Sequence, residues 1–447
     1  MPEILKTVVT DDSPALSSYA AGVSAVPAVS SPPTRALGPA QKGEGLAGLQ
    51  TFRSLRHRNY RLLWFGTLFS SSGQWIQQVT LGWLIYQMTG TPFLLGAING
   101  FRSLPLLLLG PVGGVAADRG NRKLLMLATQ VWLLMVTFLF ATIIVMGQLR
   151  VWHLFLFTLF TGVGWAFNMP VRQSVIPNLV PKEDLMNAVA LNSAGFNVTR
   201  ILGPTAAGLM IAKFGAGENF YIQSAMYLGV ALMVIQVALL PIAQASKSVS
   251  VASNLKEGAS FVWKHPTLRT QMSLALVPVV VALPYMSLMP IFAKDILHQG
   301  AGGFGVLLSA AGVGAVIGTL SIASLGNMER KGIFMLGAVF TLGICLMLFS
   351  FSRSFPLSLV MLVLLGAVQM SYMTMNQTIL QLSTPDEFRG RVMGIYMLNQ
   401  GLLPLGSLLA GTMADFLGAP TAVFIMGASV SILALAFVTR ARSLRDL

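Results

Sequence analysis

The sequence predicts an all-α integral membrane protein with twelve transmembrane helices in two six-helix bundles. Three observations lead to this prediction. The chain is 54% hydrophobic and only 10% charged, with a mean hydropathy of +0.72, whereas soluble domains carry roughly a quarter charged residues. Its apolar residues fall into runs of about 20, the length at which a helix crosses a bilayer. Its basic residues collect on one side of these runs.

The apolar runs form two sets of six. The first set is 61–87, 93–116, 123–146, 152–176, 185–212 and 219–243, and the second is 269–292, 303–325, 332–352, 356–381, 390–416 and 419–440. These runs predict a first bundle at 53–243 and a second at 269–440. Residues 1–52 and 441–447 are expected to be cytoplasmic tails, and the first is expected to be disordered because it is rich in Ser, Ala, Pro and Gly without an apolar period.

The polar stretch 244–268 links the two bundles. Within it, Leu255, Ala259, Val262 and Trp263 recur at helical spacing. This pattern predicts an amphipathic helix that lies on the membrane surface.

The distribution of basic residues predicts the orientation. Apart from three arginines within the helices, only Arg150, Lys213, Lys294 and Arg353 lie on one side of the twelve runs, and the other basic residues lie on the opposite side or in the tail. By the positive-inside rule, the richer side faces the cytoplasm. An even number of helices then places both termini there, in a multi-pass protein of the cell membrane.

Composition excludes several classes of function. The single cysteine, Cys345, rules out an intrachain disulfide and a cysteine metal cluster. The net charge of +14 is spread along the membrane edges, so nucleic-acid binding is not expected. No nucleophile–base pair, metal cluster or ATP-binding motif is recognisable, so we expect neither an enzyme nor a cofactor. A monomer embedded in the lipid bilayer is expected.

An internal repeat relates the two halves. The stretch RQSVIPNLVPKEDL from Arg172 matches NQTILQLSTPDEFR from Asn376, with an offset of 204. Further on, Gly203, Gly208 and Gly215 match Gly406, Gly411 and Gly418, all 203 apart. An offset of six helices keeps the orientation unchanged, so the repeat is parallel, as in transporters with a central site between two halves.

Two motifs point to a family. The stretch GVAADRGNRK, from Gly114 to Lys123, resembles the signature G-x-x-x-D-R-x-G-R-[RK] of the major facilitator superfamily, with Asn121 where that family prefers Gly. Because Asn tolerates left-handed turns, we expect the loop to be intact. The pieces SSGQW and NVTRILGPTAAG resemble the drug:proton antiporter family 3 branch, which includes macrolide and multidrug efflux pumps and siderophore exporters.

The first motif implies a cytoplasmic gate. In the family's alternating-access cycle, Asp118 is expected to latch onto the positive N-terminus of the eleventh helix, near Arg389 and Arg391. The cations Arg119, Arg122 and Lys123 are expected to pair with Glu183 or Asp184. The alternative is an ordinary loop ion pair with a positive-inside anchor. The second-half copy has Gly326 in place of Asp118, so the latch is asymmetric.

The second motif lies in the fifth helix. Arg200, Gly203, Pro204 and Gly208 resemble the antiporter signature, which the family uses in exporters. The doubled glycine at the end of that signature is Ala207-Gly208 here. The alternative is routine packing of small residues between helices.

The resemblance also implies that the first, fourth, seventh and tenth helices line a central cavity. The candidates on these helices are Gln74, Gln78, Trp165, Asn168, Tyr285, Gln369, Tyr372 and Asn376. Arg102, Arg172 and Arg200 are the basic residues within helices, where a charge costs about 2.5–3.5 kcal/mol on insertion scales and is retained for function. Packing or lipid-facing positions are the alternative for each residue.

The predicted function is secondary export of a small amphipathic organic molecule, a drug-like compound or a siderophore. A proton gradient is the expected energy source, although no acid lies at mid-membrane. Asp118, Asp415 or His153 would carry the proton, or a substrate carboxylate would meet the arginines. The alternatives are import or carriage of a metal or metal chelate, such as an iron–siderophore, and a receptor or scaffold on the same fold.

Overall fold

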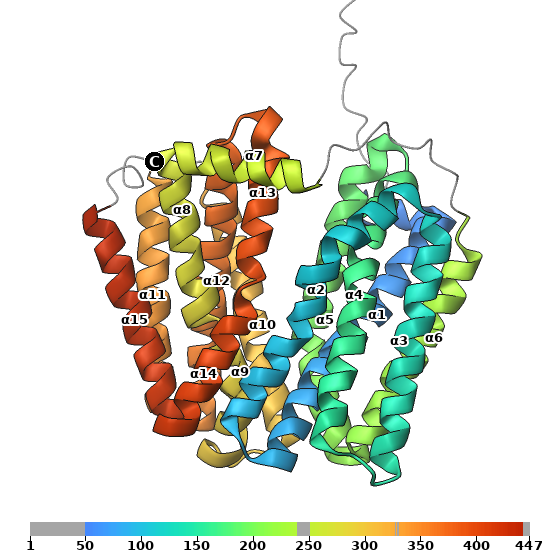
Figure 1. Cartoon of the computed structure of the whole chain (residues 1–447), viewed down its shortest axis with the longest axis horizontal. Coiled ribbons are helices and arrows are strands. Elements are labelled where there is room, and N and C mark those ends of the chain that lie inside the picture. Colours follow the sequence, from blue (N-terminus) through green and yellow to red (C-terminus); the bar gives the residue numbers. More distant parts are fainter. Residues whose placement is uncertain (1–49, 239–250, 327, 329, 441–447) are drawn as a thin grey trace, which may run out of the picture. The chain divides into compact units, whose positions relative to one another are not determined.

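The computed structural model describes residues 50–238, 251–326, 328 and 330–440, which belong to one unit, Gln50–Leu447. The predicted tails lie outside these residues except for Gln50 to Phe52. The first half contains a 3₁₀ helix (Gln50–Arg56), α1 (Arg58–Thr89), α2 (Pro92–Arg119), α3 (Arg122–Val145), α4 (Val151–Val175), 3₁₀ turns at Ile176–Asn178 and Lys182–Asp184, α5 (Leu185–Phe214) and α6 (Ala216–Gln236). All regular elements among the described residues are helical (Figure 1).

The second half begins with α7 (Val251–Lys264), which lies within the predicted linker. It continues with α8 (Pro266–Val277), a π-helical turn (Pro278–Ala282), α9 (Tyr285–Ile291), a second π-helical turn (Phe292–Ile296), α10 (Ala301–Ser324), α11 (Lys331–Phe351), α12 (Phe355–Leu382), α13 (Asp386–Gln400), α14 (Leu403–Leu417) and α15 (Ala419–Arg440). Figure 1 shows α7 crossing the ends of α8 and α13. We call this end of the helices the α7 end, and the opposite end the far end.

Nine helical stretches of the described chain are long and apolar enough to cross a membrane. They are α2, α3, α4, the stretch Pro266–Ile296, α10, α11, α12, the stretch Asp386–Leu417 and α15. The helices α1, α5 and α6 are of similar length but more polar, since amide and hydroxyl side chains interrupt their apolar residues. The count of twelve spans and the cytoplasmic termini therefore stay predictions.

Two expected helices are not continuous. The run 269–292 is divided by π-helical turns, because Pro278, Pro284 and Pro290 lack the N–H that an α-helix needs. It also extends to Ile296, which brings Asp295 onto a helix. The run 390–416 is divided between Gln400 and Leu403, next to Gly401.

Short local signals fix several helix ends. Thr91 precedes Pro92 at the start of α2, where a missing N–H costs nothing. Gly215 and Gly418, which match in the repeat, follow α5 and α14 with φ of 99° and 81°, values that favour glycine. Asn121 does not use the left-handed conformation that asparagine tolerates. Its φ is −71°, and its side-chain oxygen accepts a hydrogen bond from the Leu124 N–H (3.1 Å), which caps α3.

A buried polar chain ties the first-half helices together. Gln77 of α1 donates to Thr161 of α4 (3.1 Å), and Gln223 of α6 donates to both Gln77 (3.0 Å) and the Tyr227 hydroxyl (3.0 Å). Each such bond contributes only about 0.5–1.5 kcal/mol net, but loss of one partner leaves a buried group unsatisfied. The chain therefore specifies how α1, α4 and α6 pack.

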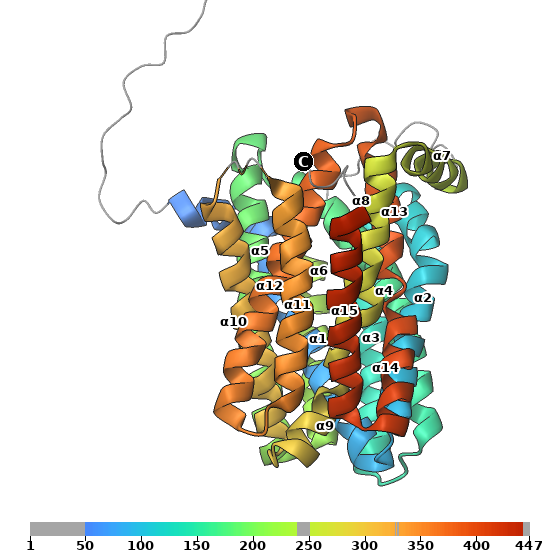
Figure 2. The ribbon, with the colours of Figure 1, turned by 90° about the vertical axis from the view of Figure 1, so that its left-hand side faces the viewer.

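Two equivalent crossings join the halves. Gly96 of α2 lies against the backbone of Ser407 and Gly411 of α14, and Gly305 of α10 lies against the backbone of Pro204 and Gly208 of α5. A side chain added to either Gly96 or Gly305 would meet a backbone carbonyl. Figure 2 shows α5 with α10 on one flank and α2 with α14 on the other. Both crossings lie in the far half of these helices.

Candidate functional site

A central cavity of about 630 Å³ lies between the two halves, in the half of the helices nearer the α7 end. Its lining comprises Thr67, Ser71 and Gln74 of α1; Trp165, Asn168, Met169, Arg172, Gln173 and Ile176 of α4 and the following turn; Asn192, Ser193, Phe196, Asn197 and Arg200 of α5; and Thr319, Met370, Met373, Thr374, Gln377, Tyr396, Met397 and Gln400 of α10, α12 and α13. The volume is that of a pocket for a drug-sized molecule.

Five of the predicted residues line this cavity: Gln74, Trp165, Asn168, Arg172 and Arg200. Around them are methionine, aromatic and amide side chains, which suit a molecule with both apolar and polar parts. Asn168 is fully buried, and its amide donates to Thr129 of α3 (2.9 Å). Its amide nitrogen is thus bound within the cavity wall, whereas its side-chain oxygen has no hydrogen-bond partner.

A second, smaller cavity of about 170 Å³ lies nearer the far end. Gln78 and Arg102 line it, together with Asn99, Ser287 and Ser407. Gln74 and Gln78 thus share one face of α1, as their spacing predicts, but they face different cavities. The same face continues with Gly82, which also lines the small cavity.

Four predicted cavity residues are buried in the second half instead. Tyr285, Gln369, Tyr372 and Asn376 line neither of the two cavities and are between 0% and 7% exposed. On α12 the lining residues are Met370, Met373, Thr374 and Gln377. An offset of one residue turns a helix by about 100°, and the side chains predicted on this helix point into its own half.

The second motif forms the crossing between α5 and α10. Gly208 lies against Ala301 and Gly305, and Gly203 lies against the Trp75 side chain. One turn further, the Thr205 hydroxyl donates to Ser309 of α10 (2.7 Å). The small residues of this motif therefore bring the two halves into contact, and Arg200 enters the central cavity from the same helix.

The cations at the α7 end have other partners than expected. Asp184 pairs with Arg53 (2.7 Å) and His57 (2.8 Å), not with Arg122 or Lys123. Arg122 donates to the carbonyls of Ala117 (3.0 Å) and Ser174 (3.2 Å), and Lys123 donates to the carbonyl of Ile235 (2.7 Å). These two side chains thus satisfy carbonyls at the ends of α2, α4 and α6, as cations at helix C-termini do.

The predicted latch is only partly described. The side chains of Asp118 and Arg119 lie outside the described residues, so their pairing stays a prediction. At the start of α13, Arg389 pairs with Asp386 (2.6 Å), and Arg391 pairs with Glu257 of α7 (3.2 Å). Gly114, at the same end of α2, has open space where a side chain would project.

Sequence reasoning missed a contact between the halves at the far end. The Tyr86 hydroxyl, on the last turn of α1, donates to Asp295 on the π-helical turn after α9. The Lys294 ammonium lies 5.4 Å from the centroid of the Tyr86 ring. The expected helix stopped at residue 292, which left this acid in a loop. In the structure the helical path continues through Asp295 to Ile296, beyond the end of the apolar run at residue 292.

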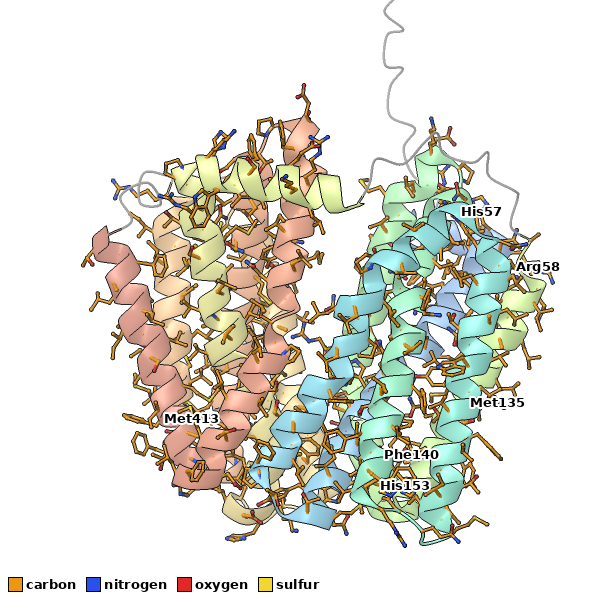
Figure 3. The ribbon with its side chains drawn as sticks, viewed as in Figure 1. His57, Arg58, Met135, Phe140, His153 and Met413 are labelled. Carbon is orange, nitrogen blue, oxygen red and sulfur yellow. The ribbon has the colours of Figure 1, made fainter. Side chains whose placement is uncertain are left out.

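The histidines lie at the ends of the helices. Figure 3 shows His57 at the α7 end and His153 at the far end. The His153 ring accepts a hydrogen bond from the Arg150 N–H (3.0 Å) and stacks on Trp152. It belongs to the start of α4 and lines neither cavity, and Asp415 is an exposed residue of α14.

Membrane-length helices in two halves, with a central cavity and close crossings on one side of it, define a membrane transporter. The chain belongs to the family of transmembrane secretion effectors in the major facilitator superfamily, which it matches over residues 49–447. The predicted family is thereby confirmed. The protein is a multi-pass transporter of the cell membrane and not an enzyme.

Relatives of known name are similar over most of their length. The chain is 26% identical to the staphyloferrin A transporter of Staphylococcus aureus, covering 84% of this chain and 96% of the relative. It is 28% identical to the multidrug efflux pump Tap of Mycolicibacterium fortuitum, covering 80% and 89%. The crystal structure of the nucleoside transporter NupG shares the fold, with a TM-score of 0.68 at 15% identity over 86% of this chain and 99% of that one.

Proposed function

We propose that this protein exports a small amphipathic organic molecule, a drug-like compound or a siderophore, by alternating access coupled to the proton gradient. The observation that carries the proposal is the central cavity of about 630 Å³, whose lining mixes arginine, amide, methionine and aromatic side chains. The names of two relatives, a multidrug efflux pump and a siderophore transporter, point to the same kinds of molecule.

The proposed cycle moves the two six-helix bundles, 53–243 and 269–440, against each other. The distribution of contacts along α2 supports this. At its far half, Gly96 and Gly100 touch the backbone of α14, whereas Gly110 and Gly114 have open space near the α7 end. Glycines with unused side-chain space in one conformation are explained if another helix packs against them in the other.

The α7 end is proposed to face the cytoplasm, following the positive-inside rule. The structure then represents a state with the outside closed and the cavity on the cytoplasmic side. Closure of the cytoplasmic side would bring Asp118 to the start of α13, with Arg389 and Arg391 beside it. In the present conformation Arg391 is held by Glu257 of α7, so closure would require that contact to rearrange.

Import of a metal chelate is the second candidate, because the name of the staphyloferrin A transporter gives no direction. Carriage of a bare metal ion gains no support, since no three His, Cys, Asp or Glu side chains gather around one point in the part of the chain that the structure describes. A receptor or scaffold role gains none either, since a cavity of this size suits a passing ligand.

Transport into everted membrane vesicles tests the proposal. With an imposed proton gradient, we expect vesicles containing the protein to accumulate ethidium, a macrolide or a metal-free siderophore, and a protonophore to abolish the accumulation. Vesicles without the protein are the control. Accumulation only in right-side-out vesicles would support import instead, and no accumulation of any solute in either kind of vesicle would contradict the proposed transport.

A further inference from the structure

Two arginines line the central cavity without an acidic partner, and Arg172 also borders a small pocket inside the first half. Arg172 of α4 and Arg200 of α5 both line the central cavity. Among the described residues, neither guanidinium forms an ion pair or a hydrogen bond, and no Asp or Glu belongs to the cavity lining. The cavity therefore holds two fixed positive charges and no negative one.

Such charges need a counterion in a membrane-embedded site. Transfer of a charged guanidinium from water into a buried site has a large free-energy cost unless an opposite charge pairs with it. Its planar set of N–H donors fits a carboxylate with two parallel hydrogen bonds. The neighbouring Gln173, Asn192 and Asn197 carry no charge, so they add hydrogen bonds without neutralising the arginines.

The smaller cavity, nearer the far end, is also lined by a positively charged residue. Arg102 lines it, and again no described Asp or Glu is in the lining. The other polar groups there are the neutral side chains of Gln78, Asn99, Ser287 and Ser407. A molecule that passes from the central cavity to this one meets positive charge in both.

We propose that the transported molecule is an organic anion whose carboxylate binds to Arg172 and Arg200, with Arg102 as the next positive site on its path. Its apolar part lies against Trp165, Met169 and Phe196. This inference rests on the proposed transport and adds the sign of the charge. It also accounts for a cavity without an acid, because the negative charge arrives with the substrate.

Binding to the purified full-length protein tests the inference without transport. The probe is 5-carboxyfluorescein, followed by fluorescence anisotropy, with citrate as a competitor that presents carboxylates alone. We expect saturable binding that citrate displaces, and at least a tenfold weaker affinity for Arg172→Gln and for Arg200→Gln. Lys213→Gln, which removes an exposed charge at the far end of α5, is the matched control and should bind as the unmodified protein does.

Arg200→Lys is a conservative variant that keeps the inference testable if a glutamine variant fails to fold. It keeps the charge but loses the paired hydrogen bonds, so we expect a loss of affinity between those of the unmodified protein and Arg200→Gln. Thermal unfolding and gel-filtration profiles identify variants that fail to fold. The inference is overturned if the unmodified protein does not bind carboxyfluorescein, or if folded arginine variants bind it equally well.

Transport separates this inference from the proposed export. Rhodamine 6G has the same kind of ring system as carboxyfluorescein but an esterified carboxyl group and a positive charge. Accumulation of carboxyfluorescein and not rhodamine 6G in everted vesicles supports both proposals. Accumulation of rhodamine 6G alone keeps export and overturns the anion. If neither dye accumulates, export of these dyes fails, and the binding measurement alone decides on the anion site.

Discussion

At the scale of single residues, the hydrogen bond between Tyr86 and Asp295 joins the halves at the far end. It connects the last turn of α1 to the helix after α9, so opening of this end must break it. A hydrogen bond to a charged group contributes about 1.5–3 kcal/mol. Because Asp295 is exposed, the lower figure applies, and it corresponds to roughly a tenfold change in a conformational equilibrium.

We therefore predict that Tyr86→Phe favours opening of the far end. The measurement is the labelling rate of Ser407→Cys, in the small cavity, by a membrane-impermeant maleimide in a Cys345→Ala background. We expect a rate about ten times higher. Tyr221→Phe is the matched control, because the Tyr221 hydroxyl pairs with Thr142 inside the first half (3.0 Å). Equal rates for both variants would exclude a gating role for Tyr86.

Asp118 is the second residue whose charge is predicted to matter. Asp118→Asn keeps the size of the side chain but removes the attraction to the N-terminus of α13, which is worth about 0.3–2 kcal/mol. We expect transport into everted vesicles to fall severalfold, with unchanged amounts of protein in the membrane by immunoblot. Normal transport by this variant would remove the basis for a latch at Asp118.

At the scale of helices, two glycines of α2 provide a test of the two proposed conformations, one closed at the far end and one closed at the α7 end. Gly96 lies against the backbone of α14, whereas Gly114 has open space where a side chain would project. A valine at position 96 would meet backbone atoms, which cannot move aside as a flexible side chain can. A valine at position 114 has room now, but would obstruct any closure of the α7 end.

We predict opposite effects for Gly96→Val and Gly114→Val. Gly96→Val should raise the labelling of Ser407→Cys, because the far end cannot close. Gly114→Val should leave the cavity open at the α7 end and raise the labelling of Gln400→Cys in everted vesicles. Both should stop transport. If the two variants shifted the same reporter in the same direction, the alternate use of the two ends of α2 would be refuted.

At the scale of the whole molecule, the orientation in the membrane is the open prediction. Lys182 lies exposed at the α7 end and Arg353 lies exposed at the far end. We expect an impermeant maleimide to label Arg353→Cys in intact cells and Lys182→Cys only in everted vesicles, again with Cys345→Ala. A permeant maleimide should label both in either preparation. The reverse pattern would invert the orientation, and labelling from the same side would contradict the proposed helix count between them.

The sequence alone determined the features that depend on composition and local order. Apolar runs and the few charges determined an all-helical membrane protein, because a backbone in lipid must satisfy its hydrogen bonds within the helix. The repeat from Gly203 to Gly418 was visible because the halves are copies. It includes Gly208 and Gly411, which the structure places at the contacts between the halves. Arg172 and Arg200 were recognisable because charge is rare in such helices.

Only the tertiary structure decided which side chains meet. The π-helical turns that interrupt the run 269–292 and bring Asp295 to Tyr86 depend on packing, which the apolar run alone does not reveal. The cavity face of α12 was predicted one residue away from its true position, and one residue turns a helix by about 100°. A helix that is apolar on most of its faces shows little periodic pattern, so its sequence does not reveal which face points to the cavity. The partners of Asp184 and Arg391 were likewise decided by contacts between segments far apart in the chain, which no local sequence encodes.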